Sequence, residues 1–281
     1  MKPPPFAYVR PTSLDEAAQE LQSDDGAMVL AGGQSLVPML NLRIARPTTV
    51  IDISRIPGLR GIETTPERVK IGALTTHSDI EAHDWPNSLS ALPEGTSHIG
   101  YPAIRHRGTF GGSLAHADPA AELPSLMVAL DASIDLHSAN GLRSVAADEF
   151  FTGYYSTARS HDELLTGVTV PVSPGLRTGF AEFSRRTGDF AIALAATATW
   201  TDGGSVRARV VVGGLDVRPR RIGAIEDALV DGGNWREACT PEVLAPFTEP
   251  SDDIHGTAGY RLRLGAEMVR RAITRMEGGG E

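Results

Sequence analysis

The residues best suited to chemistry begin in a glycine-rich turn that follows an apolar run. The stretch VLAGGQSLVPMLNLR, residues 29–43, is typical of a strand that passes through the turn AGGQS and resumes as an apolar helix. Glycine lets the backbone approach another group closely, and N–H groups at the start of a helix attract anions. The turn therefore predicts a binding site for an anionic ligand.

A second glycine cluster, RHRGTFGGSLAHADP, occupies residues 105–119. Beside its three glycines stand Thr109 and Ser113, whose hydroxyls can donate hydrogen bonds to phosphate or ribityl oxygens. Either cluster taken alone is better explained as a structural turn. Two such turns, each tied to regular structure and one with hydroxyl neighbours, favour the two halves of one pyrophosphate clamp.

Other kinds of site find little support. Neither glycine cluster matches the P-loop or the dinucleotide fingerprint of a Rossmann unit, and no nucleophile elbow of a serine hydrolase is present. The histidine pairs 77/83 and 98/106, and His116 with Asp118, lack the spacing of metal ligands. We therefore assign no metal site, no nucleophile and no catalytic residue.

Composition narrows the class of protein. The 281 residues are 41% hydrophobic and 22% charged, as in a soluble globular protein, and the net charge of −9 argues against a nucleic-acid binder. The N-terminus lacks the apolar core of a secretory signal, and no window is apolar enough to span a bilayer, so we expect a cytoplasmic protein. Cys239 is the only cysteine, which excludes an all-thiolate iron–sulfur site in this chain.

The elements that must position the two turns can be read from periodicity. Ser13 and Glu16 form a capping box ahead of an amphipathic helix. Asp118 with Pro119 is a good start for a helix that reaches Leu130, in which Pro124 marks a restart or a kink. We expect strands at 27–33, 49–56, 68–76, 132–138 and 164–172, a helix after the first turn, and a hairpin turn within 137–144.

The C-terminal third reads as a separate α+β unit. Residues 172–179 are rich in Pro and Gly and mark a boundary. Beyond them, FSRRTGDFAIALAA predicts a turn at Thr187-Gly188-Asp189, after which Phe190 opens an apolar strand; taken alone, this is an ordinary hairpin with solvated arginines. A second strand spans 205–215, and helices are expected at 224–230 and 257–276.

Seven segments, in this order, resemble the flavoprotein (medium) subunit of the molybdenum hydroxylases. This family includes bacterial carbon monoxide, nicotine and caffeine dehydrogenases, and its flavin domain also occurs within xanthine dehydrogenase. The segments are AGGQSLVPMLNLRIARP, VIDISRI, IGALTTH, IGYPAIRHRGTFGGSLAHADPAAELP, GYYSTA, RRTGDFAIA and DDIHGTAGYRLRL. They span nearly the whole chain, and the first and fourth are specific to this flavin fold.

The resemblance implies an α+β fold. A vanillyl-alcohol-oxidase-type (PCMH-type) FAD-binding domain would cover residues 1–176, with two α+β subdomains at about 1–56 and 57–176, and a smaller C-terminal α+β flavoprotein domain would cover 177–281. FAD would lie extended between them, bound noncovalently. The residues implied to bind it are Val29, Leu30, Ala31, Gly32, Gly33, Gln34, Ser35, Leu36, Ile99, Thr109, Phe110, Gly111, Gly112, Ser113, Asp118, Glu122, Leu165, Asp189 and Phe190.

The resemblance also implies roles for these residues. The two turns would hold the pyrophosphate, Ile99 would lie near the flavin, and Glu122 would accept a hydrogen bond from a cofactor hydroxyl. Leu165 would line the adenine end, and Asp189 with Phe190 would reach toward the isoalloxazine ring.

The chain also departs from the family pattern at three positions. Members often carry lysine at the position of Glu182, Asn or Asp at that of Ser113, and Tyr or Trp at that of Phe190. These changes remove a positive charge and a hydrogen-bond donor that can tune the flavin, so the details of redox tuning do not carry over, whereas FAD binding does.

The function implied is electron transfer within a complex. Substrate would be hydroxylated at a molybdopterin centre in a large subunit, and electrons would pass through [2Fe–2S] clusters of a small subunit to FAD in this chain and on to an external acceptor. A dimer of heterotrimers is expected, without nucleic acid or a membrane span. Two alternatives are a self-sufficient flavin oxidase or dehydrogenase, whose catalytic base would be a His or Tyr residue such as Tyr154 or Tyr155, and a scaffold that has lost the cofactor.

Overall fold

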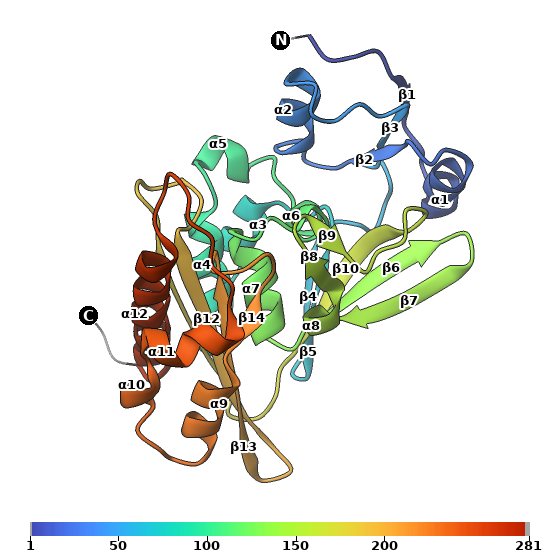
Figure 1. Cartoon of the computed structure of the whole chain (residues 1–281). Helices are drawn as coiled ribbons and strands as arrows, with labels where there is room; N and C mark the ends of the chain where they lie inside the picture. The colour runs from blue at the N-terminus through green and yellow to red at the C-terminus, as the bar shows by residue number, and fades with distance from the viewer. Residues whose placement is uncertain (1, 279–281) are drawn as a thin grey trace.

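A computed structural model describes residues 2–278, which form both helices and strands (Figure 1). The strands are β1 (Ala7–Val9), β2 (Met28–Leu30), β3 (Thr49–Asp52), β4 (Ile62–Thr64), β5 (Arg68–Gly72), β6 (Ser133–Ser138), β7 (Gly141–Ala146), β8 (Phe151–Gly153), β9 (Ser156–Thr157), β10 (Leu164–Pro171), β11 (Arg177–Phe183), β12 (Ala193–Asp202), β13 (Ser205–Gly213) and β14 (Arg220–Arg221). The α-helices are α1 (Leu14–Ser23), α2 (Leu36–Asn41), α3 (His77–Ala82), α4 (Ala91–His98), α5 (Pro102–Arg105), α6 (Phe110–His116), α7 (Glu122–Ala129), α8 (Ala147–Phe150), α9 (Gly223–Val230), α10 (Trp235–Ala238), α11 (Pro241–Leu244) and α12 (Ala258–Met276). Two short 3₁₀ helices, η1 (Asn87–Leu89) and η2 (Ala245–Phe247), complete the set.

The N-terminal unit is a small parallel sheet in the order β1-β3-β2, drawn in blue in Figure 1. Helix α1 begins as predicted, because the Ser13 hydroxyl accepts a hydrogen bond from the Glu16 N–H. The predicted capping box is only half formed, since the Glu16 carboxylate accepts from the Thr12 N–H instead of the Ser13 N–H. The predicted passage from strand through glycine turn to helix is present as β2, residues 31–35 and α2. Strand β1 was not predicted, because three residues are too few to show alternation.

A second, antiparallel sheet has the order β4-β5-β10-β6-β7. Strand β6 alternates between half-buried and buried residues, and Ile134 and Leu136 face the main hydrophobic core. The predicted hairpin turn is confirmed: Ser138 pairs with Gly141, which adopts a φ of 114° that favours glycine. Strand β4, which the sequence analysis did not predict, extends the sheet on its other side.

Helix α7 corrects the expectation of a helix that starts at Asp118. It begins at Glu122, because the Asp118 carboxylate accepts a hydrogen bond from the Ala120 N–H at 2.9 Å and closes a separate turn first. Pro124 therefore falls within the first turn of α7, where its missing N–H has no helical partner to lose. The sequence left a restart or a kink open at Pro124, and α7 starts two residues before it, at Glu122.

The C-terminal unit is an antiparallel sheet in the order β11-β12-β13-β14. Alternate residues of β12 face opposite sides: Ala193 and Ala195 pack with α12, whereas Leu194 and Ala196 join the core that contains α4 and α7. The expectation that Phe190 opens a strand is wrong. Strand β12 starts at Ala193, and Phe190 stays in the preceding loop with 65% of its surface exposed.

The α+β class predicted from the sequence is confirmed: a small parallel sheet at the N-terminus is followed by antiparallel sheets, with helices along the whole described range. In Figure 1 the parallel N-terminal sheet lies at the top, the β6–β7 hairpin to the right, and the C-terminal sheet with α12 to the left. None of the helices within residues 2–278 has the length and apolar character needed to cross a bilayer.

Candidate functional site

A cavity of about 750 Å³ lies where the N-terminal sheet, the second glycine cluster and the C-terminal unit meet. This volume lies within the range of small-molecule and cofactor pockets. The residues predicted to bind the cofactor that line the cavity are Val29, Ala31, Gly32, Gly33, Gln34, Ser35, Leu36, Ile99, Thr109, Gly111, Gly112, Ser113, Asp118, Glu122, Leu165, Asp189 and Phe190. Leu30 and Phe110 do not line it, because Leu30 packs against the core around Leu40 and Phe110 is fully buried in the main core.

The first glycine turn touches the second. A Cβ atom added to Gly32 would lie 2.1 Å from the backbone oxygen of Arg107, so only glycine permits the two turns to approach this closely. The backbone N–H groups of residues 32–35 donate no hydrogen bond to any other described residue. Because this turn also lines the cavity, it offers a row of unpaired N–H donors to a ligand.

The second turn offers a different set of groups. The N–H groups of Phe110 and Gly111 bond to the carbonyls of Thr75 and Ala73, and the N–H of Gly112 bonds to the Thr109 hydroxyl oxygen. The backbone donors of residues 110–112 are therefore committed within the protein, contrary to the expectation that backbone groups of both turns face the ligand. The hydroxyls of Thr109 and Ser113 line the cavity and remain able to donate.

The two ends of the cavity differ in composition. At one end, Tyr101 and Phe190 are exposed, and a Cβ on Gly188 would lie 3.0 Å from Gly100, so the loop before β12 touches the segment after α4. The other end is lined by Leu21, Ala27, Leu164, Leu165 and the loop of residues 158–163. The glycine turns lie between these ends, the first between β2 and α2 and the second at the start of α6 (Figure 1).

Two carboxyl groups are buried beside the cavity. Glu122 lines it with 4% of its surface exposed, and the Glu182 side chain, 1% exposed, has no hydrogen-bond partner for either oxygen. Burial raises the pKa of Glu182 to about 7, and burial together with the nearby Glu182 raises the pKa of Glu122 well above its usual value. His98 Nδ1 lies 4.0 Å from Glu182, but burial lowers the His98 pKa, so a neutral imidazole faces Glu182.

Asp118 is held by two donors at the edge of the cavity. Besides the Ala120 N–H, its carboxylate accepts a hydrogen bond from the Tyr155 hydroxyl at 2.9 Å, and the His116 ring lies 5.0 Å from that of Tyr155. Burial and the Asp118 charge raise the pKa of Tyr155 well above its usual range. Tyr155 is therefore a poor catalytic base at neutral pH, which argues against a self-sufficient oxidase built on this residue.

Sequence reasoning missed several residues of the site. Arg159 lines the cavity from a loop that carries no motif, and Leu21, from the buried face of α1, lines it from a helix assigned only a structural role. His77 also lines the cavity, and burial lowers its pKa to about 4. Within residues 2–278, no group of His, Cys, Asp and Glu side chains is arranged to hold a metal ion.

Comparison with known proteins gives matches along almost the whole chain. Residues 4–173 match the model for the FAD binding domain in molybdopterin dehydrogenase, and residues 178–276 match the CO dehydrogenase flavoprotein C-terminal domain. The nicotine 6-hydroxylase medium subunit of Paenarthrobacter nicotinovorans is 36% identical over 97% of this chain and 98% of its own length. The carbon monoxide dehydrogenase medium chain of Hydrogenophaga pseudoflava is also 36% identical, over 97% of each chain.

Solved structures agree with the sequence matches. A structure of carbon monoxide dehydrogenase from Hydrogenophaga pseudoflava, in a form that lacks the Mo-pyranopterin moiety of the molybdenum cofactor, superimposes with a TM-score of 0.93 and covers 100% of both chains at 36% identity. Quinoline 2-oxidoreductase from Pseudomonas putida 86 superimposes with a TM-score of 0.89, 35% identity and 99% coverage of both chains.

Proposed function

The chain belongs to the medium, FAD-binding subunits of the molybdenum hydroxylase family, and on that premise we propose that it receives electrons from an iron–sulfur subunit and passes them to an external acceptor. The observation that carries the proposal is the row of unpaired N–H groups at residues 32–35, set between the end with Tyr101 and Phe190 and the end with Leu21 and Leu165. FAD has the matching form, with a charged pyrophosphate between two flat ring systems.

The N–H groups of residues 32–35 bind the pyrophosphate from one side, and the hydroxyls of Thr109 and Ser113 bind it from the other. Neither turn contains a lysine. This agrees with binding of the pyrophosphate by backbone N–H groups and hydroxyls, which need no charged side chain. FAD is held noncovalently, through contacts of this kind.

The flavin ring occupies the end formed by Ile99, Tyr101, Asp189 and Phe190. Bound FAD supplies the redox chemistry, and the protein supplies position and access. Tyr101 is 56% exposed and Phe190 is 65% exposed, so this end is reachable from outside. Leu165 and its neighbours take the adenine, and Glu122 contacts a cofactor hydroxyl between the ends.

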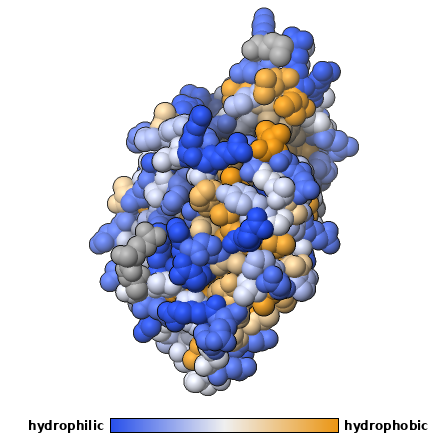
Figure 2. Space-filling model, turned by 60° about the vertical axis from the view of Figure 1, so that its left-hand side comes forward, coloured by the Kyte–Doolittle hydropathy of each residue, from blue (hydrophilic) through white to orange (hydrophobic). Residues whose placement is uncertain are grey.

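Electrons reach this chain from [2Fe–2S] clusters in a small subunit, after oxidation of substrate at a molybdopterin centre in a large subunit. Cys239, the only cysteine, is half buried, and burial raises its pKa to about 11, so this chain supplies no cluster ligands. In Figure 2, apolar side chains gather around the N-terminal part near α2, where Val37, Leu42 and Ile44 are exposed, and such a surface suits subunit contact. We propose a cytoplasmic dimer of heterotrimers.

The absorption spectrum of the chain expressed alone tests the cofactor assignment. A yellow protein that releases intact FAD on acid precipitation, identified by mass, is the expected result. A colourless protein that does not take up added FAD, alone or with its partner subunits, would overturn the assignment.

A test of the direction of electron flow requires the complete complex. We expect substrate added anaerobically to the complex to bleach the flavin absorbance after the iron–sulfur absorbance, in a stopped-flow measurement. The chain alone, loaded with FAD, should show no bleaching with the same substrate. Direct reduction of the isolated chain by an organic substrate would instead support a self-sufficient oxidase.

A further inference from the structure

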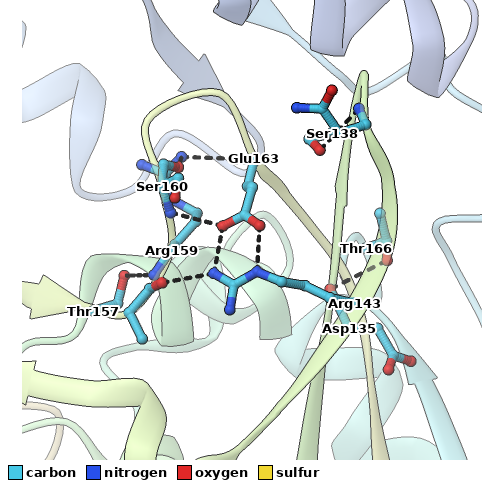
Figure 3. Close-up of polar contacts among 10 residues, drawn as sticks. Asp135, Ser138, Arg143, Thr157, Arg159, Ser160, Glu163 and Thr166 are labelled. Atoms are coloured by element: carbon cyan, nitrogen blue, oxygen red, sulfur yellow. Dashed lines mark hydrogen bonds and ion pairs between the residues drawn. The ribbon is translucent and has the colours of Figure 1, made fainter.

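The loop of residues 158–163 holds an arginine against the cavity. Arg159 Nη1 donates to three backbone oxygens of its own loop, those of Ser160 at 3.0 Å, His161 at 3.2 Å and Glu163 at 2.7 Å. Its Nε and Nη2 atoms donate to no described residue. Figure 3 shows how this loop is folded around Arg159 and Glu163. One edge of the guanidinium therefore fixes the loop, and the other edge is left for a ligand.

Arg159 also lacks a direct ion pair, although the charges of Glu163 and Asp162 act on it. The carboxylate of Glu163 is taken by Arg143, which donates to both of its oxygens, and by the Ser160 N–H at 2.7 Å (Figure 3). Among the described residues, none pairs its carboxylate with Arg159 within ion-pair distance. Of the residues that line the cavity, Arg159 is the one Lys or Arg. A guanidinium that lines a cavity without an ion-pair partner can bind a ligand that offers acceptor atoms or a π face.

Arg159 lies at one end of the cavity, so it can contact only one end of an extended ligand. The loop lies at the end lined by Leu21, Ala27 and Leu165, and the His161–Asp25 contact at 3.1 Å ties it to the segment before β2. Tyr101 and Phe190 lie at the opposite end, beyond the glycine turns. A flat heterocycle fits between apolar side chains here, with ring nitrogens as acceptors for the guanidinium edge.

We propose that Arg159 is a specificity residue that binds the adenosine half of the cofactor and so selects FAD over FMN. The inference rests on the proposed function, since it takes the pyrophosphate to lie at the glycine turns. FMN ends at its single phosphate and does not extend to the loop, whereas FAD and ADP both carry the adenosine that Arg159 contacts through Nε and Nη2.

Binding of FAD, FMN and ADP to the purified, cofactor-stripped chain tests the proposal by calorimetry. In Arg159→Met, we expect the dissociation constants of FAD and ADP to rise roughly ten-fold or more, since a charge-assisted contact is lost, while that of FMN is unchanged. Arg159→Lys should recover part of the FAD affinity through its charge. Equal weakening of FAD and FMN would overturn the proposal, because Arg159 would then act on a phosphate that both share.

Arg143→Met is the matched control, because Arg143 anchors the same loop through Glu163 and the Ala158 carbonyl but does not line the cavity. It should keep most of the FAD affinity. An equal loss in both variants would mean that Arg159 merely holds the loop, and the proposal would fail. Failure of the unaltered chain to bind any of the three ligands would instead refute the FAD site itself.

Discussion

At the scale of single residues, the buried Glu182 makes the free energy of unfolding depend on pH. Its carboxyl is sealed from solvent without a hydrogen-bond partner, and Glu122 lies near enough for each charge to disfavour the other. Two buried carboxyls in this situation do not both ionise at neutral pH. The pair therefore holds at least one proton beside the cavity, and Glu122 meets a ligand as a group that can donate as well as accept.

Replacing Glu182 by Gln keeps the shape of the side chain and removes its charge. The folded-state pKa values of Glu182 and Glu122 lie above the unfolded value of 4.5, so between about pH 4.5 and 7 the native state binds more protons than the unfolded state. The free energy of unfolding of the unaltered chain therefore falls as the pH rises through this interval. At pH 8 we expect E182Q to be more stable by roughly 3 kcal/mol, because the pKa of Glu182 goes from 4.5 in the unfolded chain to about 7 in the folded one and each pKa unit corresponds to about 1.4 kcal/mol.

Urea unfolding at several pH values between 5 and 8 measures this difference. The curves for the unaltered chain and for E182Q should converge toward pH 5. The exposed Glu63 provides the control, since E63Q should shift stability little at any pH. A constant gap between E182Q and the unaltered chain across the whole interval would show that the buried carboxyl is not the cause.

Gly32 gives a second prediction at this scale. In Gly32→Ala the new methyl group collides with the Arg107 carbonyl, which is backbone, so the first turn must move away from the second. We expect the FAD dissociation constant to rise roughly ten-fold or more, because the N–H donors no longer point at one place. Fluorescence titration measures the affinity. Gly153→Ala, whose added Cβ meets only Ser156 at 4.0 Å, should leave it unchanged.

At the scale of elements, β11 and α12 pack without a side chain between them at one point. A Cβ on Gly179 would lie 2.0 Å from the Ala272 carbonyl, so the helix rests directly on the strand. Gly179→Ala forces the two elements apart and should lower the free energy of unfolding by about 1–3 kcal/mol, the usual cost of overpacking. Thermal and urea unfolding measure the loss.

Gly259 provides a matched substitution in the same helix. It is exposed in the first turn of α12, and a Cβ there would meet only the Arg263 guanidinium at 3.7 Å. Gly259→Ala should therefore stabilise the chain, by up to about 1 kcal/mol, because alanine is the better helix former. If G179A and G259A changed stability in the same direction, the close contact would not explain the G179A result.

At the scale of the whole molecule, the cavity joins segments that are far apart in the sequence. Its walls come from the turn at 31–35, the cluster at 108–118, the strand β10 and the loop at 188–190. A ligand that contacts all four segments binds only the folded chain, so its binding energy adds to the stability of the fold.

FAD should therefore raise the unfolding temperature of the cofactor-stripped chain. At a free concentration of about 100 times its dissociation constant, the added stability is roughly 2.7 kcal/mol, which corresponds to a rise on the order of 5 °C or more for a chain of this size. Differential scanning fluorimetry at increasing ADP, which lacks the fluorescent ring, offers the parallel measurement. An unfolding temperature that stays constant across the ADP series and the FAD series would contradict the cavity assignment.

Local signals in the sequence determined many of the elements. The serine cap of α1, the strand, glycine turn and helix from residue 28 to residue 41, the β6–β7 hairpin and α12 each follow from neighbouring residues, because caps, turns and periodicity act over a few positions. The same local signals misplaced the start of α7 and of β12. At α7, the local hydrogen bond from Ala120 to Asp118 closes a turn ahead of the helix. At β12, Gly188 lies against the distant Gly100, a contact that strand periodicity does not show.

The sequence by itself thus determined the class of the fold, the family and the two glycine turns, because these depend on residue type and order. The tertiary structure alone decided which groups remain free. It committed the N–H groups of residues 110–112 to the protein, left those of 32–35 unpaired, sealed Glu182 without a partner and turned Arg159 toward the cavity. Several of these outcomes depend on contacts between residues distant in the chain, such as those of residues 110 and 111 with Thr75 and Ala73, and such contacts exist only once the chain has folded.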